Sequence, residues 1–282
     1  MLVHDRRGAG PPLVLIHGIG ARRGAWEPVA ERLAPVRETF ALDLPGFGDS
    51  PPLPAGREPT IDAYADAVER FCGAAGLERP HVAGNSMGGA IALELARRGT
   101  VASATALSPA GFWSEPERAW STAILRVSRL AARRAGGPLR CAVGSAAGRV
   151  AALGLFYGRP AALDPAVARE DLRMLGAAPA FEATLAALGR HRFADGDQLD
   201  GVPVTIGWGT RDRLLLHPTQ PRRARAALPR ARHVVLERCG HLPMHDDPDQ
   251  VAALLRVASG DGGERPAAVG APGTATSRPP AG

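Results

Sequence analysis

The chain contains several short runs of apolar residues, and each run stops abruptly at a glycine or a polar residue. Within a run the apolar residues are nearly continuous rather than alternating, which is typical of strands buried on both faces of a parallel sheet. We therefore expect six buried strands, at residues 13–16, 39–42, 81–83, 102–107, 202–208 and 233–236. Before the first run only residues 2–5 have strand character, so at most one further short strand precedes it.

Segments with helical periodicity separate these runs. They lie at residues 26–33, 61–75, 87–98, 221–228 and 248–257. Regular alternation of strand and helix predicts βαβ units, and hence an α/β fold with a mostly parallel central sheet and helices on both faces.

The alternation is interrupted between residues 111 and 196, where no convincing strand pattern occurs. Helical patterns are present there near residues 115–134, 164–176 and 181–192. We therefore expect an inserted helical cap over residues 111–198, between two parts of one core at residues 1–110 and 199–258. Residues 259–282 are rich in glycine, proline and alanine, and we expect a disordered tail because they cannot bury enough apolar surface.

The composition excludes several classes of protein. The 282 residues include no apolar run approaching the ~18 residues of a membrane span, and the first residues lack the apolar stretch of a signal peptide. The three cysteines, Cys72, Cys141 and Cys239, are too few and too scattered for a disulfide framework or a zinc site. We expect a cytoplasmic protein, a monomer or homodimer, with reduced thiols, no metal and no cofactor.

All 34 basic residues are arginine, and the net charge is +6. No arginine block resembles a nucleic-acid-binding arm, so we expect no nucleic-acid partner. Residues 112–196 hold 12 arginines and 7 acidic residues, an excess of 5 positive charges. Arg126, Arg129 and Arg133 recur there at helical spacing, and the opposing apolar stripe would be Ile124, Val127, Leu130 and Ala131. A basic rim attracting acidic substrates or anionic lipid surfaces is one interpretation, and the commoner arrangement, a solvated outer helix face, is the other.

The strongest local motif is Gly84-Asn85-Ser86-Met87-Gly88-Gly89, which lies between an expected strand and an expected helix. It matches the G-x-S-x-G nucleophile elbow, in which a strained turn lifts the serine above the sheet. Glycines two positions either side leave room for that turn. An inert serine in a glycine-rich turn is the alternative interpretation of Ser86.

A serine nucleophile needs a base, and the base needs an acid that orients it. His241 follows the last expected strand, and Asp212 follows the strand before it. Both therefore lie at the edge of the sheet where ligands bind in open α/β folds. We expect His245 to belong to a helix entry, Asp43 to be structural, and Asp246, Asp247 or Asp249 to cap the last helix.

Two N–H groups are also needed to hold the oxyanion. We expect one from Met87, at the start of the helix that follows Ser86. The second should come from the loop His17-Gly18-Ile19-Gly20, most plausibly from Ile19 with Gly20 as the alternative. The remaining histidines, His17 among them, are expected to be packing or surface residues.

Together these motifs resemble the α/β-hydrolase superfamily. The resemblance rests on His17-Gly18-Ile19-Gly20, Asp43-Leu44-Pro45-Gly46-Phe47-Gly48-Asp49-Ser50, Gly84-Asn85-Ser86-Met87-Gly88-Gly89, Gly209-Thr210-Arg211-Asp212 and Gly240-His241. It implies the α/β-hydrolase fold, a helical cap and a Ser–His–Asp mechanism. The elbow is also similar to that of the meta-cleavage-product C–C hydrolases. That superfamily usually has about two more strands at the start, which indicates a trimmed sheet edge or a start codon assigned too late.

We therefore expect a serine hydrolase that cleaves an ester or related acyl bond of a small, partly apolar substrate. C–C bond hydrolysis or cofactor-free perhydrolysis by the same triad is the alternative, and a non-catalytic small-molecule receptor is a third hypothesis. The residues expected to bind substrate are Trp113, Phe112, Phe156 and Leu242.

Overall fold

The computed structural model describes residues 1–193, 199 and 201–260 and contains a seven-stranded sheet. Its strands are β1 His4–Arg7, β2 Pro12–Ile16, β3 Glu38–Leu42, β4 His81–Asn85, β5 Ser103–Leu107, β6 Val204–Gly209 and β7 Arg232–Leu236. The order across the sheet is β1-β3-β2-β4-β5-β6-β7, and every neighbouring pair is parallel except β1 and β3. The mostly parallel sheet expected from the apolar runs is confirmed.

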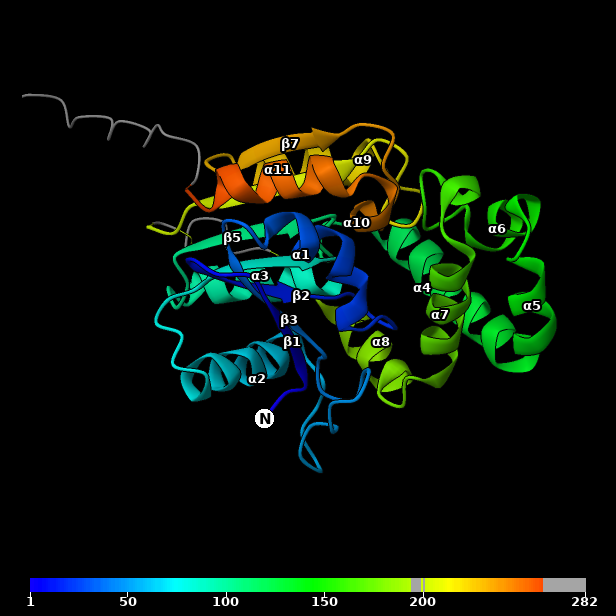
Figure 1. Cartoon of the computed structure of the whole chain (residues 1–282), viewed down its shortest axis with the longest axis horizontal. Coiled ribbons are helices and arrows are strands. Elements are labelled where there is room, and N and C mark those ends of the chain that lie inside the picture. The colour runs from blue at the N-terminus through cyan, green and yellow to red at the C-terminus, as the bar shows by residue number, and fades with distance from the viewer. Residues whose placement is uncertain (194–198, 200, 261–282) are drawn as a thin grey trace, which may run out of the picture.

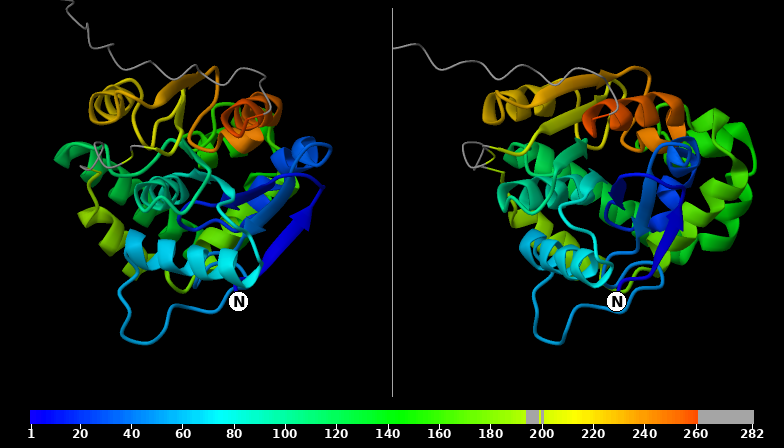
Figure 2. Two further views of the ribbon diagram at one scale, coloured as in Figure 1. Left: turned by 90° about the vertical axis from the view of Figure 1, so that its left-hand side faces the viewer. Right: turned by 60° about the vertical axis from the view of Figure 1, so that its left-hand side comes forward.

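Helices cover both faces of this sheet, as expected. Helices α1 Glu27–Leu33 and α11 Pro248–Ala258 pack on one face, and α2 Ile61–Ala74, α3 Met87–Arg97 and α9 Thr219–Ala227 pack on the other. Figure 1 shows the sheet between these layers, and Figure 2 shows α2 and α11 on opposite sides of it. The sixth expected strand differs in one respect: β7 is an edge strand, and of its residues only Leu236 is fully buried.

A helical insertion, defined here as helices α4 to α8, separates β5 from β6. These helices are α4 Glu115–Arg134, α5 Gly136–Ala142, α6 Ala146–Leu153, α7 Pro165–Ala177 and α8 Phe181–Arg190. In Figure 1 the green helices of the insertion stand together beside the sheet. Helices α5 and α6, like the short α10 Pro243–Asp246, were not expected, because glycine and proline lower the helical propensity of their sequences.

Helix α4 is oriented differently from the sequence-based expectation. Val127 and Leu130 were expected on an apolar stripe facing inward, but they are 64% and 47% exposed. Arg129 is buried instead, with its side chain over the Phe181 ring and close to Glu182. The buried side of α4 is formed by Glu117, Ser121, Leu125, Arg129 and Ala132, so an arginine takes part in the packing where the sequence indicated aliphatic residues.

The predicted tail falls almost entirely outside the described residues, because residues 261–282 are not described. Ser259, at its start, receives two hydrogen bonds from the buried Arg37 side chain. Of the helices that the structure describes, none has the length and apolar character required to cross a membrane.

Candidate active site

Ser86 lies at the sharp turn between β4 and α3, as the elbow motif predicts. Its φ of 58° places a non-glycine residue in the left-handed region, which is a strained conformation. A Cβ atom at Gly84 would lie 2.0 Å from the carbonyl oxygen of Gly88, and one at Gly88 would lie 2.2 Å from that of Ile16. Only glycine therefore fits at these two positions, and the sequence at the turn is dictated by its geometry.

His241 and Asp212 lie side by side at the carboxyl ends of the last two strands. The Nδ1 atom of His241 is 2.9 Å from Oδ2 of Asp212, and both side chains are buried. The other carboxylate oxygen, Oδ1, accepts hydrogen bonds from the backbone N–H groups of Leu214 and Leu215. Because both of its oxygens are engaged, the Asp212 carboxylate is held in one orientation. It bonds to His241 through Nδ1, so the Nε2 atom of the ring remains available to accept a proton.

Ser86 and His241 line the same pocket. The hydrogen bonds found among the described residues do not include one between Ser86 Oγ and His241 Nε2. Ser86 and His241, the expected nucleophile and base, therefore line one cavity, and Asp212 is hydrogen-bonded to the Nδ1 atom of His241.

Two residues that the sequence did not indicate hold the loop carrying His241. The amide nitrogen of Asn85, next to the elbow, donates to the carbonyl oxygen of His241 over 2.9 Å. Asp246 is buried and accepts hydrogen bonds from the N–H groups of Gly240, Gly158 and Arg159, which tie this loop to the helical insertion. Of the three aspartates expected as candidates for the cap of the last helix, Asp247 caps α11 by accepting from the N–H of Gln250, and Asp246 holds the His241 loop instead.

The loop after β2 lies against the elbow. A Cβ atom at Gly18 would approach the Ser86 Cβ to 3.1 Å, so glycine allows this close packing. The buried His17 ring accepts a hydrogen bond from the N–H of Leu44 at Nε2 and is bonded through Nδ1 to the carbonyl oxygen of Gly18. Burial lowers the pKa of His17, in keeping with a neutral, structural side chain. Ile19 and Gly20 line the pocket, and Met87 is buried at the start of α3.

The four residues expected to bind substrate occupy different places. Phe156 and Leu242 line the pocket that contains Ser86 and His241. Trp113 lines a second, narrow cavity that also reaches Ser86. Phe112 lines neither cavity, because its ring packs against Phe193 in the hydrophobic core, with 5.4 Å between ring centroids.

One wall of the pocket is polar, and the sequence had not indicated it. Tyr157, Asp171 and His245 line this wall, whereas most other lining side chains are apolar. The Tyr157 hydroxyl donates a short hydrogen bond to the Asp171 carboxylate, and the rings of Tyr157 and His245 are in edge contact. Burial raises the pKa of Asp171 to about 6, raises that of Tyr157 well above its usual value, and lowers that of His245. Asp171 is thus the charged residue of this wall at neutral pH.

Within the described part of the chain, no group of three or more His, Cys, Asp or Glu residues is placed to hold a metal ion. The polar groups at the pocket include the Ser86 hydroxyl, the imidazole of His241 bonded to Asp212, and the wall formed by Tyr157, Asp171 and His245.

Known proteins share this architecture. The family model described as the alpha/beta hydrolase fold matches residues 11–248. An uncharacterized protein of Mycobacterium tuberculosis is 30% identical over 251 residues, covering 86% of this chain and 73% of that protein. The pimeloyl-[acyl-carrier protein] methyl ester esterase of Aeromonas salmonicida is 29% identical over 271 residues, covering 89% and 96%. The structure of a thermophilic esterase from Thermogutta terrifontis superposes with a TM-score of 0.67 at 25% identity, covering 91% and 92% of the two chains. The chain therefore belongs to the α/β-hydrolase fold family.

Proposed function

We propose that the chain is a serine hydrolase that cleaves an ester or related acyl bond of a small, partly apolar substrate. The observation that carries this proposal is the pocket lined by both Ser86 and His241, with Asp212 bonded to the far side of the imidazole. Membership of a hydrolase family with esterase relatives supports it.

In the first half of the reaction, Ser86 Oγ attacks the carbonyl carbon of the substrate while His241 Nε2 takes the hydroxyl proton. Asp212 accepts from Nδ1, so the proton on that nitrogen stays in place and Nε2 keeps its lone pair for this transfer. The carboxylate then stabilises the imidazolium that forms. The strained turn at Ser86 supports this role, because it presents the side chain rather than the backbone to the pocket.

The negative charge that develops on the carbonyl oxygen needs preorganised donors. The proposed donors are the N–H groups of Met87, at the positive end of the α3 dipole, and of Ile19 in the loop against the elbow. The His17 ring bonds to the Gly18 carbonyl oxygen of this loop and to the N–H of Leu44 after β3, and this link supports a fixed position for Ile19.

In the second half, His241 gives its proton to the leaving group and the acyl chain remains on Ser86. Water enters, loses a proton to His241 Nε2 and attacks the acyl carbon. The bond from that carbon to Ser86 Oγ then breaks, His241 returns the proton to Oγ, and the acid is released. No cofactor is required at either step.

The walls of the pocket support a substrate of mixed character. Phe156, Leu242 and the insertion residues Leu125, Leu153, Leu172 and Leu175 offer apolar contact. The Asp171 carboxylate, bonded to Tyr157, offers an acceptor for a hydroxyl or ammonium group. We propose that the substrate carries such a donor on an otherwise apolar acyl or alcohol part, because expelling water from Asp171 without replacing its hydrogen bonds would weaken binding.

The experiment is a kinetic one, with p-nitrophenyl esters of increasing acyl length and the variant Ser86→Ala. The expected result is turnover by the wild type with an optimum chain length, and loss of about 10⁴-fold or more in kcat in the variant. The matched control is Ser128→Ala, a serine on α4 outside both cavities, which should retain activity. Ester hydrolysis unchanged in Ser86→Ala would contradict the proposal. If Ser86 is reactive but no ester is turned over, C–C bond hydrolysis or perhydrolysis by the same residues becomes the better assignment.

A further inference from the structure

The outward face of helix α4 carries an apolar stripe where a solvated helix would carry polar side chains. Trp120, Val127 and Leu130 are 42%, 64% and 47% exposed. With Ala123 and Arg134 they follow the spacing 120, 123, 127, 130, 134, so they lie on one side of the helix. Of the seven large hydrophobic side chains that are exposed in the described residues, these three and Val150 of α6 belong to the insertion.

Arginines flank this stripe. Arg126 and Arg133 lie beside it and Arg134 lies on it, all within about 120° of the helix circumference. These three side chains are exposed, as is that of Arg140 on α5. Between residues 119 and 163 the sequence holds seven arginines and no aspartate or glutamate. One of the seven, Arg129, is buried and paired with Glu182 of α8. No ion pair joins the four exposed arginines to any carboxylate of the described residues.

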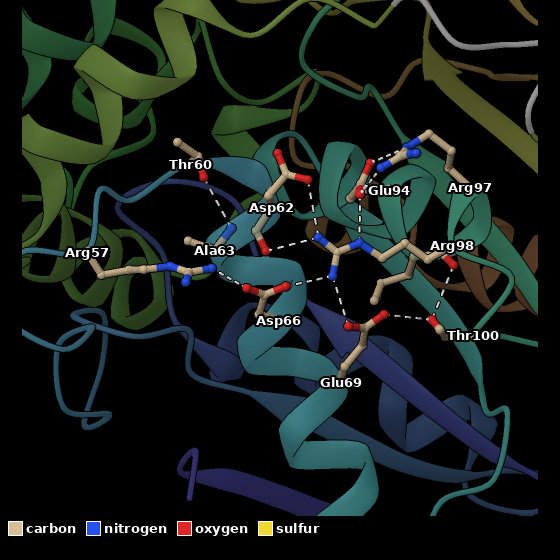
Figure 3. Close-up of polar contacts among 11 residues, drawn as sticks. Arg57, Thr60, Asp62, Ala63, Asp66, Glu69, Glu94, Arg97, Arg98 and Thr100 are labelled. Carbon is tan, nitrogen blue, oxygen red and sulfur yellow. Dashed lines mark hydrogen bonds and ion pairs between the residues drawn. The ribbon is translucent and has the colours of Figure 1, made fainter.

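The arginines at the end of α3, and Arg57 before α2, have different surroundings. Figure 3 shows Arg98 bonded to Asp62, Asp66, Glu69 and Glu94, with Arg97 on Glu94 and Arg57 on Asp66. The arginines at the end of α3 are therefore paired with carboxylates, whereas those on the outward face of α4 are not. A face that combines unpaired arginines with an exposed tryptophan and aliphatic side chains is the pattern of a helix that lies at a membrane interface.

We propose that the outward face of α4, the stripe at 120, 123, 127, 130 and 134 with Arg126 and Arg133, docks on an anionic lipid membrane surface. The arginines would contact lipid phosphates, and Val127 and Leu130 would enter the headgroup region. The exposed edge of Trp120, whose indole N–H donates to the carbonyl oxygen of Arg213, would border that region. A second copy of the chain is a poorer occupant, because two such faces would bring like charges together. The proposal does not depend on the hydrolase chemistry.

The same helices reach the pocket from their inner sides. Leu125 of α4 and Leu153 of α6 line the cavity that contains Ser86. Docking through α4 would therefore place the insertion, rather than the far face of the sheet, against the membrane. Substrates that partition into lipid would then be concentrated near the pocket.

The test measures co-sedimentation of the full chain with vesicles of phosphatidylcholine, with and without phosphatidylglycerol. The expected result is binding to the anionic vesicles only, and binding that weakens as salt is raised. Removing two charges in Arg126→Gln/Arg133→Gln should lower the partition coefficient roughly 30-fold. The matched control is Arg222→Gln/Arg225→Gln on α9, which removes the same charge from another exposed helix and should bind like the wild type.

Tryptophan fluorescence reports the orientation. Trp120 is the exposed one of the four tryptophans, because Trp26, Trp113 and Trp208 are buried. The emission should therefore shift to shorter wavelength on vesicle binding, and this shift should disappear in Trp120→Phe while binding persists.

Several outcomes would overturn the proposal. Wild-type protein that stays in the supernatant with anionic vesicles at low salt would do so, as would equal losses in the α4 and α9 variants. Binding to poly-L-glutamate without binding to anionic vesicles would assign the face to an acidic protein instead. Concentration-dependent dimerisation that is lost in Leu130→Ser, without vesicle binding, would assign it to a second copy of the chain.

Discussion

Helices α3 and α4 each end at a pair of adjacent arginines, and the two pairs have opposite surroundings. Arg97 and Arg98 are held by carboxylates of α2 and α3, as Figure 3 shows, whereas Arg133 and Arg134 have no carboxylate partner among the described residues. Both pairs benefit from the helix dipole, so the dipole does not explain the difference.

The difference teaches where the net charge of +6 resides. Residues 112–196 carry an excess of 5 positive charges. Arg118, Arg129 and Arg173 of this region pair with carboxylates, but Arg126, Arg133 and Arg134 on α4 have no carboxylate partner among the described residues. The core supplies Ser86, Asp212 and His241, whose positions follow from the strand ends. The insertion supplies much of the pocket wall and the unpaired arginines of α4. We therefore assign chemistry to the core, and substrate selection and docking to the insertion.

The largest difference between the two regions should appear in catalysis. His241→Ala should lower kcat for a p-nitrophenyl ester about 10⁴-fold or more, and Asp212→Asn roughly 10⁴-fold, because each leaves Ser86 without an oriented base. His233→Gln, on edge strand β7, is the control and should stay close to the wild type. Steady-state kinetics at saturating ester would measure these effects. Wild-type kcat in the His241→Ala variant would contradict the role of His241 as the base that activates Ser86.

The next largest effect should be on vesicle binding, when a carboxylate is placed beside the arginines of α4 as carboxylates lie beside the arginines of α3. Leu130→Glu places a carboxylate four residues after Arg126 and four before Arg134, where helical side chains meet. It also removes one apolar side chain from the outward face. We expect binding to phosphatidylglycerol vesicles to fall at least tenfold while the melting temperature holds or rises slightly. Undiminished vesicle binding by this variant, if it is folded, would show that the unpaired arginines and apolar residues of α4 are not the cause of membrane binding.

The polar wall of the pocket should change selectivity by a smaller amount. The measurement is the ratio of kcat/KM for a p-nitrophenyl ester with a terminal hydroxyl to that for its alkyl analogue, which cancels pH effects common to both substrates. In the wild type this ratio should fall as the pH drops through about 6, because the raised pKa of Asp171 makes its carboxyl neutral below that value. Asp171→Asn should lower the ratio at pH 7.5 by about tenfold and abolish its dependence on pH. An unchanged ratio with normal ester turnover would contradict the role of Asp171 and leave the serine mechanism standing.

The smallest effect should be on stability. Hydrogen bonding to Arg98 lowers the pKa of Asp66, so this pair stabilises the folded state above the unfolded pKa of the carboxyl. That contribution is lost as the pH falls through the lowered pKa. Arg98→Gln should therefore lower the free energy of unfolding by about 1 kcal/mol at pH 7 and by less near pH 3. Arg133→Gln, which has no such partner to lose, should have almost no effect. Equal destabilisation by the two variants in urea titrations would show that the pairing difference has no energetic consequence.

The parts of the fold that the sequence predicts well are those with one dominant physical cause. Buried strands need continuous apolar runs, and the elbow needs Gly84 and Gly88 because any Cβ there would collide with backbone. The positions of Ser86, Asp212 and His241 at strand ends follow from the same alternation. These features depend on short stretches of chain, so one sequence is enough to find them.

The sequence predicts less well where distant residues decide the outcome. The apolar periodicity of α4 predicts the wrong buried side for this helix. Burial of Arg129 depends on Phe181 and Glu182, which belong to another helix. Asn85 and Asp246 act through hydrogen bonds to backbone far along the chain, and no local pattern marks them. Tyr157 and Asp171 are likewise brought together by the packing of helix α7, so their shared wall has no sequence signature.

The central claim is that Ser86 is an activated nucleophile, and one measurement tests it most directly. Purified protein would be incubated with a fluorophosphonate probe and digested, and the labelled peptide would be identified by mass spectrometry. The account predicts one phosphonate adduct on Ser86, formed rapidly in the wild type and severely slowed in His241→Ala. No adduct, or an adduct on another serine with Ser86 unmodified, would contradict it.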